Sequence, residues 1–513
     1  MILIWIVFLP LAGGLLAWVA VKHGQYAGRK KDLMARWISI AALAVDMVLV
    51  LFLWLSGPHA VTIAGGPWIA EVSRPWIPSL GISFHLAMDG ISLLLVLLTV
   101  ILGMAAVIAS WTEIAGQVGF FHFNLMATLA GIIGVFVAVD LFLFYFFWEV
   151  MLVPMYFLIA LWGHEKRIYA AVKFFIFTQL SGLLMLASIL GIYFIHGGKA
   201  GIYTFDYFKL LGTPLESGTA FFLLMGFLAA FLIKLPAVPF HTWLPDAHTE
   251  APTAGSVILA GLLLKTGGYG LLRFAIPLFP GASTELAPLV MTLGIIGILY
   301  GAVLAFAQSD LKRLIAYTSV SHMGFVLLGV FVWNEKALQG VIIQMLCHGI
   351  STGALFILAG AVQERIHTRE MMRMGGLWAV APRMGGVWLF FALASLGLPG
   401  MGNFIGEFLI LLGTYEAHPL MAAFAALGLV LSTVYAVWMV QKAFFGANHE
   451  GWRIPDLEAK EMTVMAIMIA LILWLGLYPQ PCFDTAREGL SSLQRNTSGA
   501  PKASSIEIFG RQQ

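Results

Sequence analysis

Long apolar windows recur along the whole chain, and they restrict its fold more than any other feature. Of the 513 residues, 60% are hydrophobic and 11% are charged, which is far more apolar than a water-soluble domain. A helix that crosses a bilayer needs roughly 20 apolar residues. Such windows lie near 2–21, 36–56, 90–110, 119–138, 140–161, 170–195, 219–240, 253–274, 286–306, 313–332, 338–362, 385–412, 420–443 and 461–479. We therefore expect an all-α integral membrane protein of about fourteen spans, with residues 1–513 forming one membrane domain.

The basic residues predict how these spans are oriented. Connections after odd-numbered spans hold most of them, as in Lys22 to Arg36, Arg365 to Arg383 and Lys442 to Lys460. Connections after even-numbered spans hold only Arg74, Lys199, Lys209, Arg273 and Lys336. Because cytoplasmic loops carry the excess of lysine and arginine, odd-numbered connections should face the cytoplasm. Both termini, including a tail over 480–513, should then face outward.

The sequence gives no support for several other classes of protein. The net charge of +2 gives no reason to expect nucleic-acid binding, and no nucleotide-binding glycine motif is present. Cys347 and Cys482 lie far apart without metal-ligand spacing, so they indicate neither a metal site nor a disulfide framework. A haem subunit needs pairs of axial histidines, and the spans offer one pair, His322 and His348.

Four of the charged residues inside apolar spans are the most informative: Glu149, Lys234, Lys265 and Glu407. Each central charge costs about 2.5–3.5 kcal/mol on insertion scales unless it is paired or hydrated. The plain alternative is that these charges pair only to hold helices together. Intramembrane ionisable groups more often mark an ion or proton path, and we favour that interpretation for the set. His322 and His348 could be packing residues, or relay groups, because imidazole titrates near physiological pH.

Helix breakers accompany two of these charges. Pro236 and Pro239 follow Lys234, and the segment Leu398-Pro399-Gly400 precedes Glu407. Broken helices beside ionisable groups are typical of transport sites. Glu149 and His322 are 173 residues apart, and so are Lys234 and Glu407. We therefore expect two inverted five-helix repeats, helices 4–8 (about 119–274) and 9–13 (about 286–443), with helices 7 and 12 broken.

Five stretches, in this order, resemble a known family: FFWEVMLVPMY at 146–156, HTWLPDAH at 241–248, APTAGSV at 251–257, YTSVSHMGF at 317–325 and LPGMGNFIGEF at 398–408. They are similar to the antiporter-like membrane-arm subunits of bacterial NADH:quinone oxidoreductase (respiratory complex I) and to multisubunit cation/proton antiporters. Two of the three antiporter-like subunits, and the stand-alone antiporters, carry lysine in the broken twelfth helix. Glu407 at that position favours the remaining complex I subunit.

The resemblance implies a proton-translocating subunit of a multi-subunit enzyme. Glu149 and Lys234 would form a charge pair in which Glu149 modulates the proton affinity of Lys234, the central proton carrier. Lys265 would be a further relay, and His322 and His348 would lie on a hydrated path with Glu407 at its exit side. The chain would hold no cofactor, whereas partner subunits would hold NADH, FMN, iron–sulfur clusters and quinone. The expected partners are the other membrane-arm subunits, especially two paralogous antiporter-like ones, in a bacterial inner membrane.

Two alternatives stay open on the sequence alone. One is a subunit of a cation/proton antiporter or of a membrane-bound hydrogenase, which shares the fold and most of the charges. The other is a structural scaffold of the membrane arm that conducts nothing. The polar residues His241, Asp246, His248 and Glu250, in the connection after helix 7, could couple to neighbouring subunits or cap helix ends.

Overall fold

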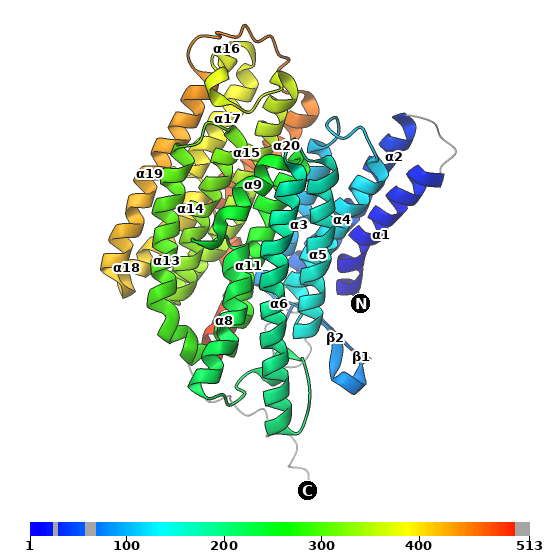
Figure 1. The fold of residues 1–513 in the computed structure, drawn as a ribbon, viewed down its shortest axis with the longest axis vertical. Helices are drawn as coiled ribbons and strands as arrows, with labels where there is room; N and C mark the ends of the chain where they lie inside the picture. Colours follow the sequence, from blue (N-terminus) through cyan, green and yellow to red (C-terminus); the bar gives the residue numbers. More distant parts are fainter. Residues whose placement is uncertain (24–28, 57–67, 498–513) are drawn as a thin grey trace.

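Long helices make up almost all of the chain in the computed structural model, which describes residues 1–23, 29–56 and 68–497 (Figure 1). The first half comprises α1 (Ile2–His23), α2 (Arg29–Ser56), α3 (Gly90–Ala109), α4 (Val118–Val137), α5 (Leu141–Trp162), α6 (Arg167–Ala200), α7 (Tyr207–Leu210), α8 (Ser217–Lys234) and α9 (Trp243–Glu250). The second half continues through α10 (Thr253–Ile258), α11 (Leu264–Gly270), α12 (Ile276–Leu278), α13 (Pro280–Phe306), α14 (Leu311–Val332) and α15 (Glu335–Ile366). It ends with α16 (Leu377–Val380), α17 (Pro382–Ser395), α18 (Gly402–Ala417), α19 (Pro419–Phe444), α20 (Ala459–Leu477) and α21 (Gln480–Thr497).

The number of spans agrees with the prediction once the broken helix is considered. Within the described ranges, 13 helices are long and apolar enough to cross a membrane, with α10 to α12 counted as one continuous span. The predicted span 385–412 is divided into α17 and α18, of 14 and 16 residues. Each half is shorter than a full crossing, and together they supply the remaining span. The seventh predicted span ends early, at Lys234, before the two prolines.

Successive connections lie at alternate ends of the bundle, as expected for a chain that crosses a membrane back and forth. At one end, Asp140 caps the start of α5, accepts hydrogen bonds from Ser83, and forms an isolated β-bridge with Asp206. At the other end, Asp310 caps the start of α14 and forms a β-bridge with Glu370. In both cases an aspartate before the second helix of a predicted repeat pairs with the chain that follows the third helix. This parallel supports the predicted repeat, which stays a prediction.

Two features at the Asp140 end were not predicted from the sequence: a β-hairpin, and a helix within the C-terminal tail. β1 (Ala70–Ile77) and β2 (Ile82–Met88) form an antiparallel hairpin that Figure 1 shows at the lower edge of the bundle. Residues 480–497 of the predicted tail form the helix α21, while 498–513 lie outside the described residues. Hydrogen bonds fasten α21 to the bundle: Trp54 Nε1 donates to Thr485, and Trp333 Nε1 donates to Thr497.

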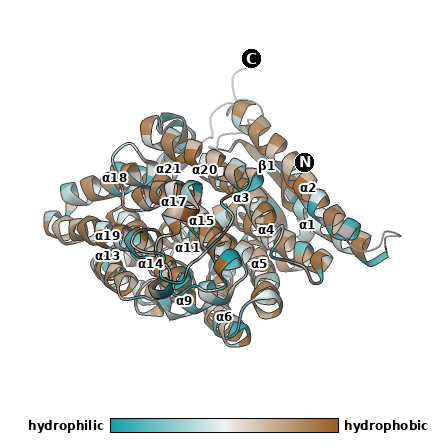
Figure 2. Cartoon of the chain, turned by 90° about the horizontal axis from the view of Figure 1, so that it is seen from above, coloured by the Kyte–Doolittle hydropathy of each residue, from teal (hydrophilic) through white to brown (hydrophobic). Residues whose placement is uncertain are grey.

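Close helix packing depends on small residues, as is usual where hydrophobic driving force between helices is weak. A Cβ on Gly324 would lie 2.7 Å from the carbonyl oxygen of Gly294, so α13 and α14 approach backbone to backbone. In the view along the bundle, α1 and α2 lie at one side and α13, α18 and α19 at the opposite side (Figure 2). The helices α11, α14 and α15 run between them and carry three of the six predicted site residues, Lys265, His322 and His348.

Arg273, which was predicted to lie in a connection, and Lys312, which directly precedes a predicted span, are both buried in helices. Arg273 lies inside the eighth span, in a π-helical turn (Leu271–Ala275), and is 2% exposed. Lys312 lies in the first turn of α14 and is fully buried. The next long helix after Arg273, α13, begins only at Pro280, and Asp310 caps the start of α14 before Lys312. Both basic residues therefore lie within helices and not in the connections between them. Residues 24–28, within the first basic connection, lie outside the described ranges.

Candidate functional site: a buried polar axis

The six predicted site residues come from six different helices. Glu149 lies on α5, Lys234 ends α8, Lys265 lies on α11, His322 on α14, His348 on α15 and Glu407 on α18. All but Glu149, which is partly buried, are at most 1% exposed. Burial of this many ionisable groups in apolar helices is costly unless they contact one another, and four of them do.

Lys265, His348, His322 and Glu407 form one chain of contacts. Lys265 Nζ lies 2.7 Å from His348 Nδ1. The imidazole rings of His348 and His322 lie 5.5 Å apart between centroids. His322 Nδ1 then lies 2.8 Å from Glu407 Oε1. The structure therefore brings together two histidines whose spacing in the sequence left their role open.

Neutral polar groups complete the glutamate end of this chain. Gln344 Nε2 donates to Glu407 Oε1 at 2.9 Å. On the other side of the ring, His322 Nε2 lies 3.1 Å from Ser395 Oγ and 3.2 Å from the hydroxyl of Tyr435. These contacts fix the orientation of the imidazole, so one ring nitrogen faces the carboxylate and the other faces two hydroxyl groups.

Irregular backbone lies next to the charged residues, as the sequence predicted. Lys234 is the last residue of α8, directly before the break at Pro236. Glu407 lies in α18, which begins just after the break at Pro399-Gly400. Lys265 follows a π-helical turn (Leu259–Leu263), and its ammonium group donates to the carbonyl of Ala260 within that turn. π-Helical turns often occur at functional sites.

Glu149 and Lys234 do not form an ion pair in this structure. Among the described residues, the Lys234 ammonium group has no hydrogen-bond partner. It lies over two aromatic rings, 5.0 Å from the centroid of Trp148 and 5.6 Å from that of Phe174. The Glu149 carboxylate lies against α6, where a Cβ on Gly182 would come within 2.8 Å of Oε1. The pair predicted from the sequence is therefore in an open arrangement.

The connection after helix 7 binds other parts of the same chain. Asp246 accepts from Lys173 at 2.6 Å and from Arg313 at 2.9 Å. Glu250 accepts from the backbone N–H of Lys166 at 2.7 Å. His248 is fully buried and stacks on the ring of Phe356 at 4.6 Å between centroids. Asp246 thus joins α9 to α6 and α14.

Asp89 and Asp46 are two of the buried acidic residues that were not predicted from the sequence. Asp89 is fully buried, caps α3, and pairs with Arg273, whose Nε also contacts the hydroxyl of Tyr269. Asp46 lies fully buried in α2, and its carboxylate has no hydrogen-bond partner among the described residues. Asp46 could have been identified from the sequence, because it is a charged residue inside the apolar window 36–56. Asp89 stands directly before a span, where an ordinary helix cap is expected.

Two groups at the Asp310 end have perturbed acidity. Burial, together with the nearby charges of Lys312 and Arg369, lowers the pKa of His164 to about 3. Burial raises the pKa of Glu113, although Lys312 opposes that shift. Lys312 Nζ lies 3.4 Å from His164 Nε2. His164 is therefore a neutral ring that contacts a buried lysine.

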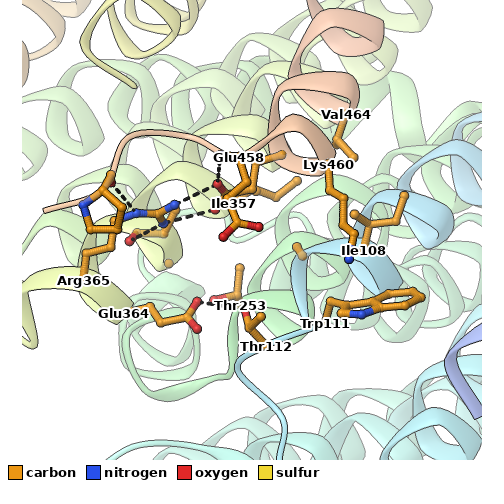
Figure 3. Close-up of a pocket in the computed structure, with 15 residues that line it drawn as sticks. Ile108, Trp111, Thr112, Thr253, Ile357, Glu364, Arg365, Glu458, Lys460 and Val464 are labelled. Carbon is orange, nitrogen blue, oxygen red and sulfur yellow. Dashed lines mark hydrogen bonds and ion pairs between the residues drawn. The ribbon is translucent and has the colours of Figure 1, made fainter. Parts of the chain in front are cut away.

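A pocket of about 340 Å³ opens at the same end, between α3, α15 and the start of α20 (Figure 3). Glu364 accepts from Thr112, Arg365 pairs with Glu461, and the Lys460 ammonium lies 5.2 Å from the ring centroid of Trp111. Thr253, the first residue of α10, also lines it. The pocket thus reaches the start of the span that carries Lys265. Among the described residues, no group of three His, Cys, Asp or Glu side chains is arranged so that it could hold a metal ion.

Broken helices with buried acids and bases in a multi-span bundle define an antiporter-like membrane subunit. The chain belongs to the NADH:quinone oxidoreductase/Mrp antiporter transmembrane family, whose model matches residues 138–433. It is 51% identical over 504 residues to NADH-quinone oxidoreductase subunit M of Pseudomonas aeruginosa, covering 96% of this chain and 98% of that protein. It is 50% identical over 505 residues to subunit M of Escherichia coli (strain K12), covering 96% and 98%. The family predicted from the sequence is confirmed.

Solved structures agree with this assignment. A chain of respiratory complex I from Thermus thermophilus with bound NADH is 32% identical, with a TM-score of 0.86, covering 97% of this chain and 100% of that one. A chain of the Mrp complex from Dietzia sp. shares the fold, with a TM-score of 0.80 at 23% identity, covering 97% of this chain and 52% of that one.

Proposed function

We propose that this chain is the M-type subunit through which an NADH:quinone oxidoreductase moves protons across the membrane. The observation that carries the proposal is the buried chain of contacts Lys265–His348–His322–Glu407. Each member can bind and release a proton, and each lies next to the following one. A chain of purely structural ion pairs would alternate positive and negative groups, whereas three proton-accepting bases follow one another here.

The geometry gives each group a role in the transfer. The Lys265 ammonium donates its proton to His348 Nδ1, and the imidazolium that forms releases a proton from Nε2. His348 Nε2 has no hydrogen-bond partner among the described residues, so it is free to donate to a water molecule on the way to His322. His322 passes a proton from Nδ1 to the Glu407 carboxylate, because these two atoms are already in contact.

The Glu149–Lys234 pair supplies the control of this transfer. Burial disfavours a charged lysine and a nearby carboxylate favours it, so the separation of the two side chains sets the proton affinity of Lys234. The two groups titrate as one coupled unit. Electron transfer from NADH to quinone takes place in partner subunits, and their charges or moving helices open and close the pair.

The distribution of basic residues gives the orientation of the chain in the membrane. The Asp310 end carries the basic connections and faces the cytoplasm, so both termini face the periplasm across a bacterial inner membrane. The partners are the other membrane-arm subunits, two of them paralogous. The paired β-bridges at Asp140 and Asp310 support two inverted repeats, helices 4–8 and 9–13.

The test is proton pumping by the intact complex carrying Lys265→Ala. The expected result is a loss of NADH-driven acidification of inverted membrane vesicles, in complexes that still oxidise NADH with a water-soluble electron acceptor. Lys336→Ala is the matched control, because Lys336 pairs with Glu416 at the surface. A complex that assembles normally and pumps normally without Lys265 would contradict the proposal and favour a structural scaffold.

Co-purification tests the assembly. A tagged chain extracted in mild detergent should bring with it flavin- and iron–sulfur-containing subunits that oxidise NADH. Recovery of membrane antiporter subunits alone, without any redox protein, would assign the chain to a cation/proton antiporter.

A further inference from the structure

The Lys234 ammonium group is buried without an oxygen ligand. It is 1% exposed, and no described residue accepts a hydrogen bond from it. Its neighbours are the faces of Trp148, at 5.0 Å, and Phe174, at 5.6 Å, each measured to the ring centroid. Both distances are within the range of cation–π attraction.

This attraction acts on a charged lysine. The ring quadrupole draws a cation towards the ring face, and the gain is largest when the cation is removed from water. A neutral amine would gain little from either ring. Two ring faces therefore make an unpaired ammonium tolerable at this depth, where no carboxylate is in contact with it.

The rings are held in place by other aromatic side chains. Trp148 is fully buried, and its ring centroid lies 5.8 Å from that of Phe144 and 5.6 Å from that of Phe231. Phe174 packs against Trp243 at 5.4 Å. The two faces are thus fixed before the ammonium reaches them, which reduces the entropy lost on contact.

Trp148 is the immediate neighbour of Glu149 on α5. Consecutive residues on a helix point in directions about 100° apart, so the ring and the carboxylate face different sides of the same turn. A lysine side chain with four rotatable bonds can reach either one from the end of α8. One turn of α5 therefore offers Lys234 two alternative partners.

We propose that Trp148 and Phe174 are positioning residues that form a second resting place for the charged Lys234 side chain when its contact with Glu149 is open. This inference rests on the proposed function. It adds that the pair can open while the lysine still carries its proton. The strength of the cation–π contacts then sets the population of the state in which the contact with Glu149 is open and Lys234 is charged.

The decisive experiment changes the electrostatics of the ring and leaves its shape intact. Tryptophan analogues with one to four fluorine atoms on the ring are placed at position 148 in the intact complex. Successive fluorines withdraw electron density from the face, so the rate of NADH-driven pumping should fall stepwise, by about threefold to tenfold in total. The same analogues at Trp388 serve as the control, because that ring is equally buried and packs only against Phe444 among the aromatic side chains described.

Ordinary substitutions give a second readout. Trp148→Phe keeps an aromatic face and should retain most of the pumping, whereas Trp148→Leu removes the face and should lose it. Equal pumping across the fluorine series, or equal pumping with Phe and Leu, would overturn the inference. Lys234→Ala is measured alongside: if it pumps normally, the proposed function fails, and if only the Trp148 series is flat, the inference alone fails.

Discussion

His322 Nδ1 lies 2.8 Å from Glu407 Oε1, so an imidazole and a carboxylate from two different helices are in direct contact inside the bundle. Glu407 lies in α18, which begins just after the break, and its carboxylate contacts a side chain of α14. Glu407→Gln keeps the size of the side chain and a hydrogen bond, but it cannot accept a proton. We expect slower NADH-driven acidification in complexes whose amount, measured by oxidation of NADH with a water-soluble acceptor, is unchanged. Pumping at the unmodified rate would show that Glu407 only holds the ring.

The contact between Lys265 and His348 predicts strong coupling between them. Lys265→Met and His348→Phe should each impair pumping, and the double variant should be little worse than either, because both steps lie on one path. The thermal stability of the purified complex is measured for the wild type, the two single variants and the double variant, so that a loss of pumping can be distinguished from a loss of stability. Fully additive losses in pumping would indicate two independent routes. His196→Phe, at the Asp140 end of α6 and bonded to Thr213, should leave pumping unaffected.

A substitution at Gly182 can move the Glu149 carboxylate without changing any charge. A Cβ there would lie 2.8 Å from Glu149 Oε1, the far end of a flexible side chain, so Gly182→Ala should displace the carboxylate and leave the helix intact. We expect a changed pumping rate with assembly preserved. Gly198→Ala, on the same helix with open space around it, is the matched control. Both changes favour helix formation to a similar degree, so only the carboxylate distinguishes them. Identical pumping by the two variants would contradict this account.

The buried pair of Arg273 and Asp89 should matter for stability. Arg273→Ala leaves an unpaired carboxylate in the interior, which typically costs about 3–5 kcal/mol. We expect a lower melting temperature or failed assembly. The double variant Arg273→Met with Asp89→Ala should recover part of the loss, because no lone charge remains. A single variant as stable as the wild-type complex would mean that water solvates Asp89.

The hairpin, which lies outside the candidate membrane spans, carries a pH-dependent contact. His85 lies 2.8 Å from both Asp206 and Glu71. Burial by itself lowers the pKa of His85, but the contacts with the two carboxylates outweigh it and hold the pKa above its usual value of 6.5. The stabilisation is complete below that usual value and is lost as the pH rises through the raised pKa. The melting-temperature difference between wild type and His85→Gln should therefore shrink from acidic to alkaline pH, and a constant difference would refute this.

The sequence predicted the features that depend on composition and on helix breakers. Apolar windows gave the spans, and Pro236 and Pro399-Gly400 marked the two breaks beside Lys234 and Glu407. It could not place residues whose role depends on distant partners. Arg273 and Lys312 lie near the ends of predicted spans. An error of one helical turn in such an end decides whether a residue is assigned to a loop or to the interior of the bundle. The position of Lys234 over Trp148, and not against Glu149, depends on the packing of α5, α6 and α8. No local pattern records that packing.

The measurement that tests the central claim most directly is proton translocation by the intact complex with Lys234→Ala. Translocation is normalised to oxidation of NADH with a water-soluble acceptor, which reports the amount of assembled complex. The account predicts that normalised NADH-driven translocation falls well below that of wild type and of the surface control Lys336→Ala. Translocation equal to that of wild type, in a fully assembled complex, would show that Lys234 is not needed to control proton transfer and would contradict the account.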